Sequence, residues 1–590
     1  MIVPSIFKKH GFIISFFIVL ISALSFRITN LNLIEFKSDE ALNIFLAAQP
    51  IFGHSFLPGG TVSSLGVLNP PIFNYILFPV TLLSLDPRVI TLFMALMNVA
   101  GIIGFFLLLR KYYGLVTATA ASLLLSFSPW AVLYSRKIWM QDLLLPFTVL
   151  MLFSVHKLIV EKKDTYWILY AASSLILIQL HQLSVIFVFM MTAFMLAKVK
   201  LNVRCFTLGI LIGLLPLIPY IIFEIQNKCP DCFALLSSRT RLNTGYSIEA
   251  FMRPLQIMGV GDFRYILGND TLTFAQRFPL AYKAREFLYL EYLLLPLGLA
   301  IFMTRYKKFS FLGYAVLLTI FSYFLLRIES FMHYYIVLLP LLFLFLATVF
   351  SFFFKSKNIF LSIGSLVLLS ILLLASIAFN KSFFDLLKTT GGTKGDYGAT
   401  FASKDKDIKE RLKKYENDPL FAERALSSYI PLSYMYGYEP FGKMLYGNVF
   451  PDDITILESK LKKDPQDKIV QFKLLNLHTR GEETVQTLYV LRIKTQQIPE
   501  YLPIYREVFQ RYMARNFKKE YSSSRFTFFY PEHWNARELE DGSIVLGSNE
   551  YELTIKNLGL NNMEITCVKL AGECDSSNIS EIRNSIRPIQ

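Results

Sequence analysis

Three acids and a lysine lie close together in a short stretch, Glu35-Phe36-Lys37-Ser38-Asp39-Glu40-Ala41, directly after the first long apolar run. Ser38 can cap a helix over residues 39–49, and acids in the first turn of a helix interact favourably with its dipole. A carboxylate at a membrane surface is partly desolvated, which raises its pKa and makes it a better general base. The stretch therefore allows two interpretations, a helix start or a site of base catalysis.

The composition is that of a membrane protein with a soluble extension. Of the 590 residues, 54% are hydrophobic and 54 are Phe, and the mean hydropathy is +0.44. Apolar runs long enough to cross a bilayer recur up to residue 379 and then stop. We therefore expect a polytopic α-helical membrane domain over residues 1–380. A Gly-rich linker over 381–403, leaning over the site, and a soluble α+β domain over 404–590 should follow.

The net charge of +15 raises the question of a nucleic-acid partner. The sequence contains no nucleic-acid motif, and basic residues of membrane proteins collect in cytoplasmic loops, where they attract anionic lipid headgroups. We therefore expect the lipid bilayer as a partner, and no nucleic acid. The apolar runs predict eleven transmembrane spans, at residues 11–29, 88–110, 114–130, 139–158, 165–180, 183–198, 205–223, 286–304, 309–327, 332–354 and 358–379.

The basic residues predict the sidedness of this domain. With the N-terminus in the cytoplasm, every cytoplasmic turn is basic, as the positive-inside rule requires. The apolar run at 72–85 is then an interfacial helix, because it is too short to span and follows two prolines. This register gives a first outer loop over 30–87, a second large outer loop over 224–285 and an extracytoplasmic C-terminal domain. The basic residues that lie on the outer face against the rule are Arg27, Arg136, Lys137 and Arg327.

Short motifs along the membrane domain carry a family resemblance. They are Ser38-Asp39-Glu40-Ala41, Asn69-Pro70-Pro71-Ile72, Arg110-Lys111-Tyr112-Tyr113-Gly114, Ser128-Pro129-Trp130 followed by Ser135-Arg136, and His181-Gln182. In order, spacing and sidedness they resemble the GT-C superfamily of membrane glycosyltransferases. Within it they are similar to the branch of protein O-mannosyltransferases, aminoarabinose lipid A transferases and RgtA-like enzymes. Asn69 departs from this branch, in which many members carry His, so we assign no chemistry to it.

The resemblance implies a polyprenyl-phosphate-linked sugar donor, an inverting transfer and a carboxylate base in the first outer loop. It points to Asp39 as the base, and leaves Glu40 to orient Asp39, to bind the donor sugar or to face solvent. Cations should stabilise the charge that develops on the leaving phosphate. The acceptor can be a protein, a lipid or a glycan, and the sugar a hexose or a pentose. Glu35 is expected to be a surface residue.

Outer-face cations and histidines are the candidates for binding the donor. Arginine matches the geometry of phosphate, but a basic residue at a helix end commonly anchors the helix by snorkelling. Asp142 begins a span and can pair with Arg136. A His at a helix end is commonly a polar terminus, and a loop with a cation and an acid can form a structural ion pair. The candidates for the donor's phosphate or sugar are Arg136, Lys137, His181, Arg327, His333, Arg239 and Arg241.

Metal-ligand patterns are sparse. The sequence has no Asp-x-Asp motif and no His cluster with metal-ligand spacing, so we predict no metal site, with a divalent cation as the alternative. Cys229 and Cys232 lie in the second outer loop with the spacing of a tight disulfide. A zinc site there would need two further ligands, and the sequence pattern offers none.

Two other functions remain open. A transporter or flippase for lipid-linked sugars would carry ionisable residues at mid-membrane, broken helices and an internal repeat. Here most charges lie at span ends, and no repeat is evident. The other alternative is a noncatalytic membrane sensor that presents the soluble domain.

Overall fold

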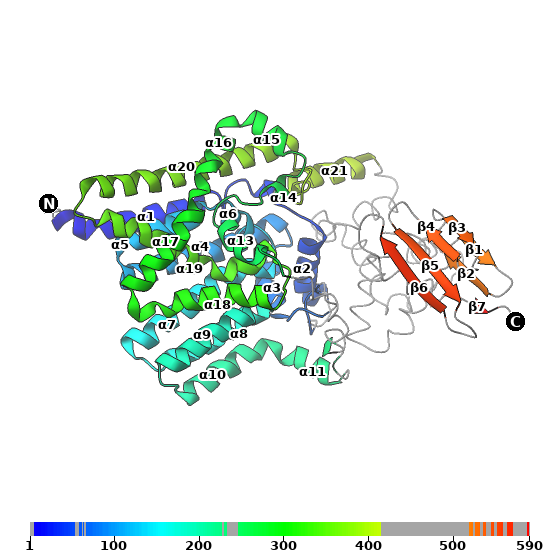
Figure 1. Cartoon of the computed structure of the whole chain (residues 1–590), viewed down its shortest axis with the longest axis horizontal. Coiled ribbons are helices and arrows are strands. Elements are labelled where there is room, and N and C mark those ends of the chain that lie inside the picture. Colours follow the sequence, from blue (N-terminus) through cyan, green and yellow to red (C-terminus); the bar gives the residue numbers. More distant parts are fainter. Residues whose placement is uncertain are drawn as a thin grey trace. The chain divides into compact units, whose positions relative to one another are not determined.

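The computed structural model contains two compact units, Met1–Glu439 and Pro440–Gln590 (Figure 1). It describes residues 5–414 except 53–57, 62, 64–66, 227–228, 230 and 233–245. In the C-terminal region it describes seven strands: 519–522, 526–530, 535–538, 544–547, 551–557, 563–569 and 587–588. The predicted start of the soluble domain, residue 404, falls within helix α21 (Phe401–Lys414), which belongs to the first unit.

The first unit is a bundle of apolar helices. Seven helical segments of the described residues are long and apolar enough to cross a membrane. Three of these segments are α4 (Pro87–Tyr113), α20 (Ile359–Thr390) and the pair α16–α17 (Pro279–Arg305). The segment Met140–Glu161 contains α7 (Leu144–His156), and Val203–Gln226 contains α10 (Val203–Leu214) and α11 (Ile218–Gln226). The segment Lys307–Leu325 contains α18 (Phe311–Leu325), and Met332–Phe354 contains α19 (Leu339–Phe354). Shorter apolar helices are the apolar part of α1 (His10–Ser25), α3 (Ile72–Thr81), α5 (Leu115–Phe127), α8 (Tyr166–Leu180) and α9 (Ser184–Lys198).

These helices confirm a polytopic α-helical membrane protein. Every one of the eleven predicted spans coincides with one of them, although the shorter ones leave the exact number of spans a prediction. The run at 72–85, predicted to be interfacial, forms the ten-residue helix α3. Helix α20 continues to Thr390, so the first part of the predicted linker is helical. The orientation of the helices in the membrane stays a prediction.

Small residues and polar caps explain how individual helices begin and pack. Asp86 caps α4 by accepting the Arg88 N–H at 2.8 Å, with Pro87 in the first helical position. Gly209 and Gly213 of α10 lie so close to α8 that a Cβ at either position would collide with it. This spacing of small residues is the one that lets membrane helices approach closely.

The first outer loop contains the 3-10 turn η1 (Leu31–Leu33), helix α2 (Ser38–Ala48) and the turn η2 (Gln49–Phe52) before α3. Helix α2 begins at Ser38, one residue before the predicted start, and the capping role of Ser38 stays a prediction. Glu40, in the first turn, accepts the backbone N–H of Lys37 at 2.9 Å. This bond corresponds to one half of a capping box, in which an acid in the first turn accepts an N–H at the helix start.

The second outer loop contains short helices that pack on the bundle. They are α13 (Glu249–Gln256), α14 (Arg264–Leu267), α15 (Thr271–Arg277) and α16 (Pro279–Leu288). Figure 1 shows α15 and α16 beside α20, and α16 makes many of its contacts with that helix.

Residues 391–400, which we call the strap, connect α20 to α21 and are packed against both outer loops. The strap forms β-bridges from Lys394 to Gly268 and from Thr400 to Glu35. Gly268 and Gly395 meet backbone to backbone, and a side chain on either would collide with the other. The Gly-rich segment predicted as a linker is thus held in place on the first unit.

The described part of the C-terminal unit consists of antiparallel strands. One sheet has the order β1-β2-β7 (Lys519–Ser522, Phe526–Tyr530, Arg587–Pro588). The other has the order β3-β4-β5-β6 (Asn535–Glu538, Ile544–Gly547, Tyr551–Asn557, Met563–Lys569). Ile544 and Val545, which point to opposite faces of β4, are both buried, so this strand is covered on both sides.

Candidate functional site

Charged side chains are buried together where the first outer loop meets the segment after α6 (Pro129–Tyr134). Glu35 forms an ion pair with Lys137 (Oε2–Nζ 3.0 Å) and another with Lys37 (Oε1–Nζ 2.6 Å). Only 2% of Glu35, 4% of Lys137 and 1% of Glu40 is exposed. We call Glu35, Glu40 and Lys137 the acid–lysine cluster. The prediction that Glu35 is a surface residue is wrong, because Ile34 and Phe36 are buried on either side of it.

Helix α2 is fixed to the rest of this cluster. Asn43 donates its side-chain N–H to the carbonyl of Ile138 at 2.9 Å, one residue after Lys137. Glu40 faces the interior, whereas Asp39, next to it in the first turn, is exposed. Of the ion pairs among the described residues, none involves Asp39. The helix therefore presents one carboxylate to solvent and buries the other.

The pKa values within the cluster depend on one another. Burial raises the pKa of Glu40 to about 7, the charge of Glu35 adds to this, and the charge of Lys137 opposes it. Burial by itself lowers the pKa of Lys137, but the carboxylates of Glu35, Glu40 and Asp142 outweigh that effect, and the net shift is upward. At neutral pH Lys137 is therefore charged, and Glu40 is close to the midpoint of its titration.

Arg136, the neighbour of Lys137, has a different set of partners. Its guanidinium donates to the backbone carbonyls of Phe26, Arg27, Thr29 and Asn30 at 2.6, 3.2, 2.6 and 2.8 Å. Burial lowers the pKa of Arg136 to about 10, so the group remains charged at neutral pH. The prediction that it pairs with Asp142 is wrong: the described ion pairs include none between them, and the Asp142 carboxylate accepts no hydrogen bond from described residues.

Arg27 is held in the same way as Arg136. It is fully buried and donates to the carbonyls of Ser126 at 2.6 Å and Leu125 at 3.3 Å. The two guanidinium groups thereby connect the end of α1 to the end of α5 and to the segment after α6. Among the described residues, every hydrogen-bond acceptor of this arginine pair is a backbone carbonyl, which carries only a partial negative charge.

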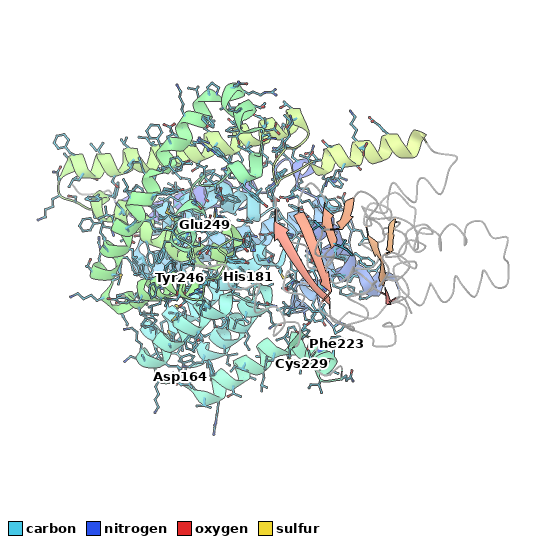
Figure 2. All side chains as sticks on the ribbon, turned by 45° about the vertical axis from the view of Figure 1, so that its right-hand side comes forward. Asp164, His181, Phe223, Cys229, Tyr246 and Glu249 are labelled. Carbon is cyan, nitrogen blue, oxygen red and sulfur yellow. A yellow bond between two sulfur atoms is a disulfide. The ribbon has the colours of Figure 1, made fainter. Side chains whose placement is uncertain are left out.

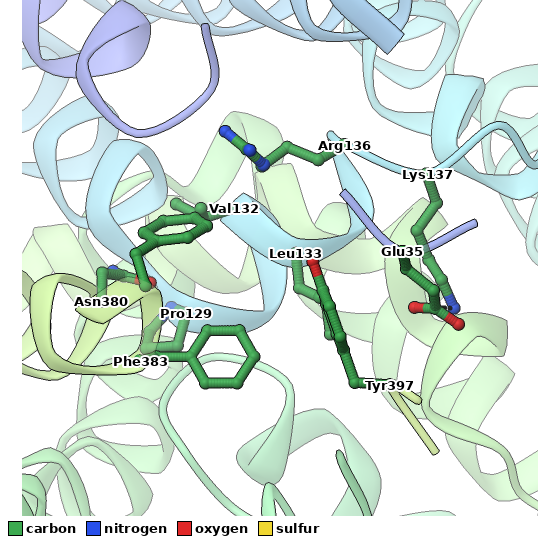
Figure 3. A pocket seen from close by; sticks show the side chains of 10 residues that line it. Glu35, Pro129, Val132, Leu133, Arg136, Lys137, Asn380, Phe383 and Tyr397 are labelled. Carbon is green, nitrogen blue, oxygen red and sulfur yellow. Dashed lines mark ion pairs between the residues drawn. The ribbon is translucent and has the colours of Figure 1, made fainter. Parts of the chain in front are cut away.

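A small cavity is lined by Arg136 and by Glu35 and Lys137 of the acid–lysine cluster (Figure 3). Its volume is about 10 Å³, close to the space that one water molecule requires. Figure 3 shows Glu35 and Lys137 paired on one side and Tyr397 of the strap next to them. Tyr397 donates its hydroxyl to the carbonyl of Leu33 at 2.5 Å. The cavity is lined by Glu35, Pro129, Val132, Leu133, Arg136, Lys137, Asn380, Phe383, Phe384 and Tyr397.

The structure brings His181 and His333 together, although they are far apart in sequence. Their ring centroids lie 5.7 Å apart, and Trp139 lies 5.8 Å from His333. The Lys137 ammonium lies 4.3 Å from the centre of the Trp139 ring, so this aromatic group adjoins the acid–lysine cluster. Burial lowers the pKa of His181 to about 4. His181 is therefore neutral at pH 7 and can contribute a hydrogen bond but no positive charge.

The remaining predicted donor-binding residues are not part of this group. Arg327 donates to the Tyr246 hydroxyl at 3.3 Å and lies over its ring at 4.4 Å. Its φ of 53° lies in the left-handed region. Arg239 and Arg241 lie outside the described residues.

The site includes residues that the sequence motifs did not indicate. Trp139 follows the Arg136-Lys137 pair by two residues, a position that could have suggested a ring beside the cations. The burial of Glu35 and the contact of Tyr397 have no local signal, because their partners Lys137 and Leu33 are distant in sequence. Lys404 of α21 donates to the carbonyl of Phe36 and so adds a second contact from beyond the membrane helices.

Potential metal ligands meet at one place among the described residues. Glu224, Cys229 and Cys232 bring a carboxylate oxygen and two sulfur atoms within 4.8 Å of one another. Cys229 and Cys232 form a disulfide, as their spacing predicts. A disulfide has no thiolate to offer a metal, so in this oxidised state the group does not provide a ligand set.

Together, the helices and the buried charged group define a polytopic membrane protein whose polar site lies where two outer loops meet the bundle. Residues 69–223 match the family described as dolichyl-phosphate-mannose-protein mannosyltransferase. This match confirms the resemblance to GT-C glycosyltransferases for the segment that contains Lys137, Trp139 and His181. It begins after Asp39 and Glu40, so their roles rest on the resemblance of their own motif.

Solved structures also resemble the chain. ArnT from Cupriavidus metallidurans in the apo state has 11% identity and a TM-score of 0.40, covering 84% of this chain and 78% of that one. The same protein bound to undecaprenyl phosphate has 11% identity and a TM-score of 0.36, covering 83% and 78%. Archaeoglobus fulgidus oligosaccharyltransferase tethered to an acceptor peptide has 14% identity and a TM-score of 0.39, covering 69% and 59%. No curated protein matches the chain.

Proposed function

We propose that this protein is a membrane glycosyltransferase that moves a sugar from a polyprenyl-phosphate donor to a hydroxyl-bearing acceptor outside the cytoplasm. The observation that carries the proposal is the meeting of two segments. Lys137, from the segment that matches a mannosyltransferase family, pairs at 3.0 Å with Glu35, four residues before Asp39. The acceptor is a protein, a lipid or a glycan, and the sugar a hexose or a pentose.

In this reaction Asp39 is the general base. Its exposed carboxylate accepts the proton of the acceptor hydroxyl while the hydroxyl oxygen forms a bond to the anomeric carbon. The bond from that carbon to the phosphate oxygen breaks on the opposite side, so the configuration inverts. The polyprenyl phosphate leaves with the charge that develops on it, and nearby cations stabilise it.

The other residues of the site support this step. Glu40 holds the first turn of α2 in place through the Lys37 N–H, and Asn43 fixes the same helix to Ile138. The backbone that carries Asp39 is therefore held rigidly. His181, His333 and Trp139 offer polar ring atoms and flat faces next to Lys137, which suit a sugar. Arg327, Arg239 and Arg241 are further candidates for the donor phosphate.

Sugar transfer in membranes tests the proposal. A set of polyprenyl-phosphate sugars is offered to the wild type and to Asp39→Asn, and the product is counted. We expect Asp39→Asn to lower the transfer rate by about 10²–10⁴-fold, because loss of a general base has effects of that size. Asp164→Asn, an exposed carboxylate on the predicted cytoplasmic face, is the matched control. Undiminished transfer by Asp39→Asn would show that Asp39 is not the general base. No transfer by the wild type from any donor would contradict the proposed function.

Chemical labelling tests the sidedness that the proposal requires. Single cysteines replace Asn32 in the first outer loop and Leu83 after α3, both of which are exposed. A membrane-impermeant thiol reagent added from outside should label both, and should not label a cysteine at Asp164. Labelling of Asn32→Cys and Leu83→Cys from opposite faces would contradict the predicted topology.

A further inference from the structure

The end of α11 carries a polar group that the proposed function does not use. Cys229 and Cys232 lie beside Glu224, which is in the last turn of α11. Figure 2 labels Cys229 and Phe223, the residue before Glu224. Glu224 Oε2 accepts the backbone N–H of Asp231 at 3.3 Å. Asp231 Oδ2 accepts from the Tyr220 hydroxyl at 2.6 Å and the Leu68 N–H at 3.0 Å. Each carboxylate thus uses one oxygen.

The second oxygen of each carboxylate has no partner among the described residues. Glu224 Oε1 and Asp231 Oδ1 are both buried and accept no hydrogen bond there, and only 9% of Glu224 and 5% of Asp231 is exposed. The described ion pairs include no cation next to either residue. A buried carboxylate oxygen that accepts no hydrogen bond is unfavourable, and a bound metal ion is one arrangement that satisfies such an oxygen.

We propose that Glu224, Cys229 and Cys232 form a zinc site when the disulfide is reduced. Two cysteines three positions apart are half of a frequent zinc ligand set, and the Glu224 oxygen already lies within 4.8 Å of both sulfur atoms. Glu224 is the ligand that the sequence pattern could not indicate, because it lies in helix α11, outside the Cys-x-x-Cys segment. Three protein ligands leave the fourth position of a tetrahedral ion open.

The two states of the site exclude each other chemically. A dithiol reductant passes two electrons and two protons to the Cys229–Cys232 sulfurs, which become thiols, and the reductant becomes a disulfide. Zn²⁺ then displaces the two thiol protons as the Zn–S bonds form. Cys232 is exposed, so a reductant can reach the bond. Both states link Cys229 to Cys232, and Asp231, between them in the sequence, is bonded to Leu68, directly before the segment that matches the family.

Metal binding to the full-length protein in detergent tests the site. The protein is reduced with a dithiol, the dithiol is removed without oxygen, and Zn²⁺ is titrated against a chromophoric chelator. We expect about one Zn²⁺ for each reduced chain and none above background for the oxidised protein. Co²⁺ in place of Zn²⁺ should give the near-ultraviolet absorption of thiolate ligands.

Variants distinguish this site from other ligands on the chain. Cys229→Ser and Cys232→Ser should each abolish the Co²⁺–thiolate band, and Glu224→Gln should weaken Zn²⁺ binding by roughly 10-fold or more while the band persists. Cys205→Ser is the matched control, since Cys205 is unpaired at the start of α10, and it should bind as the wild type does. Equal binding by oxidised and reduced protein, or by Cys232→Ser, would overturn the proposal. A Cys229–Cys232 disulfide that no dithiol can reduce would also overturn the proposal. Loss of sugar transfer alone would not overturn it.

Discussion

Arg136 and Lys137 are neighbours in the chain, carry the same charge and are both buried, yet their partners differ in kind. Arg136 donates to four backbone carbonyls at the end of α1. Lys137 faces the carboxylates of Glu35 and Glu40. A carbonyl cannot take up or release a proton, whereas a carboxylate can, so only the acid–lysine cluster responds to pH. We therefore expect Arg136 to hold the helix ends of the site together, and Lys137 to control the charge of Glu40.

The largest expected effect comes from Arg136→Met. The substitution leaves the carbonyls of Phe26, Thr29 and Asn30 without their buried donor, and we expect a loss of about 4 kcal/mol of stability. Thermal unfolding of the detergent-solubilised protein measures it. Arg136→Lys, which keeps the charge without the guanidinium fork, should recover part of the loss. If Arg136→Met is as stable as the wild type but has a raised KM for the donor, Arg136 binds the donor phosphate. Its role would then not be structural, and it would not differ from Lys137 in the way we expect.

Lys137→Met should have the next largest effect. It leaves Glu35 and Glu40 buried without their shared cation, and we expect a destabilisation of about 3 kcal/mol at neutral pH. Because the charge of Lys137 lowers the pKa of Glu40, its removal should move that pKa above 7. Lys137→Arg, as the control, should keep the pKa near that of the wild type. If Lys137→Met and Lys137→Arg lose the same stability, charge is not what the position provides.

Glu40→Gln should change how stability depends on pH. The pKa of Glu40 is about 7 in the folded protein and 4.5 in its ordinary state, so the folded state binds the additional proton between these values. Stability of the wild type should therefore fall as pH rises, by about 2 kcal/mol from about pH 5 to about pH 7. Unfolding temperatures of wild type and Glu40→Gln across this range give the difference. Parallel curves would mean that Glu40 titrates at its ordinary value.

Lys37→Met should have the smallest effect. Lys37 is one-third exposed (33%), and its ion pairs with Glu35 at 2.6 Å and with Asp396 of the strap at 3.3 Å are partly screened by water. Such pairs contribute about 1 kcal/mol or less. Unfolding at low and high salt should show the wild type approaching the variant as salt increases. A loss as large as that of Lys137→Met would mean that the two lysines hold Glu35 equally.

Features encoded locally could be predicted from the sequence. The apolar runs gave the helices, the short run after Pro70-Pro71 gave α3, and the Cys229–Cys232 spacing gave the disulfide. In the C-terminal region the run Phe526–Tyr530, which consists of aromatic residues and a Thr with high β-propensity, forms strand β2. In each case the residues that determine the feature lie next to one another.

Features that depend on distant segments could not be predicted. From its sequence neighbours, Glu35 is predicted to be a surface acid. It is buried because Lys137 and the strap pack against it in the folded protein. The sequence indicates a helix start near Ser38, but not that the Glu40 carboxylate accepts the backbone N–H of Lys37 there. For Arg136, the sequence showed an unusual cation on the outer face but not that backbone carbonyls would surround it.

The strap has a consequence for how the protein is made. Residues 33–37 are held by the Tyr397 hydroxyl, the Phe401 N–H and the Lys404 ammonium. These partners leave the ribosome more than three hundred residues after the loop they hold, since the Tyr397 contact alone spans 364 positions. During synthesis the first outer loop therefore cannot reach its folded conformation, and its acids stay unburied, until all the membrane helices have been inserted. A nascent or truncated chain that ends at α20 should therefore reach the membrane without a formed site.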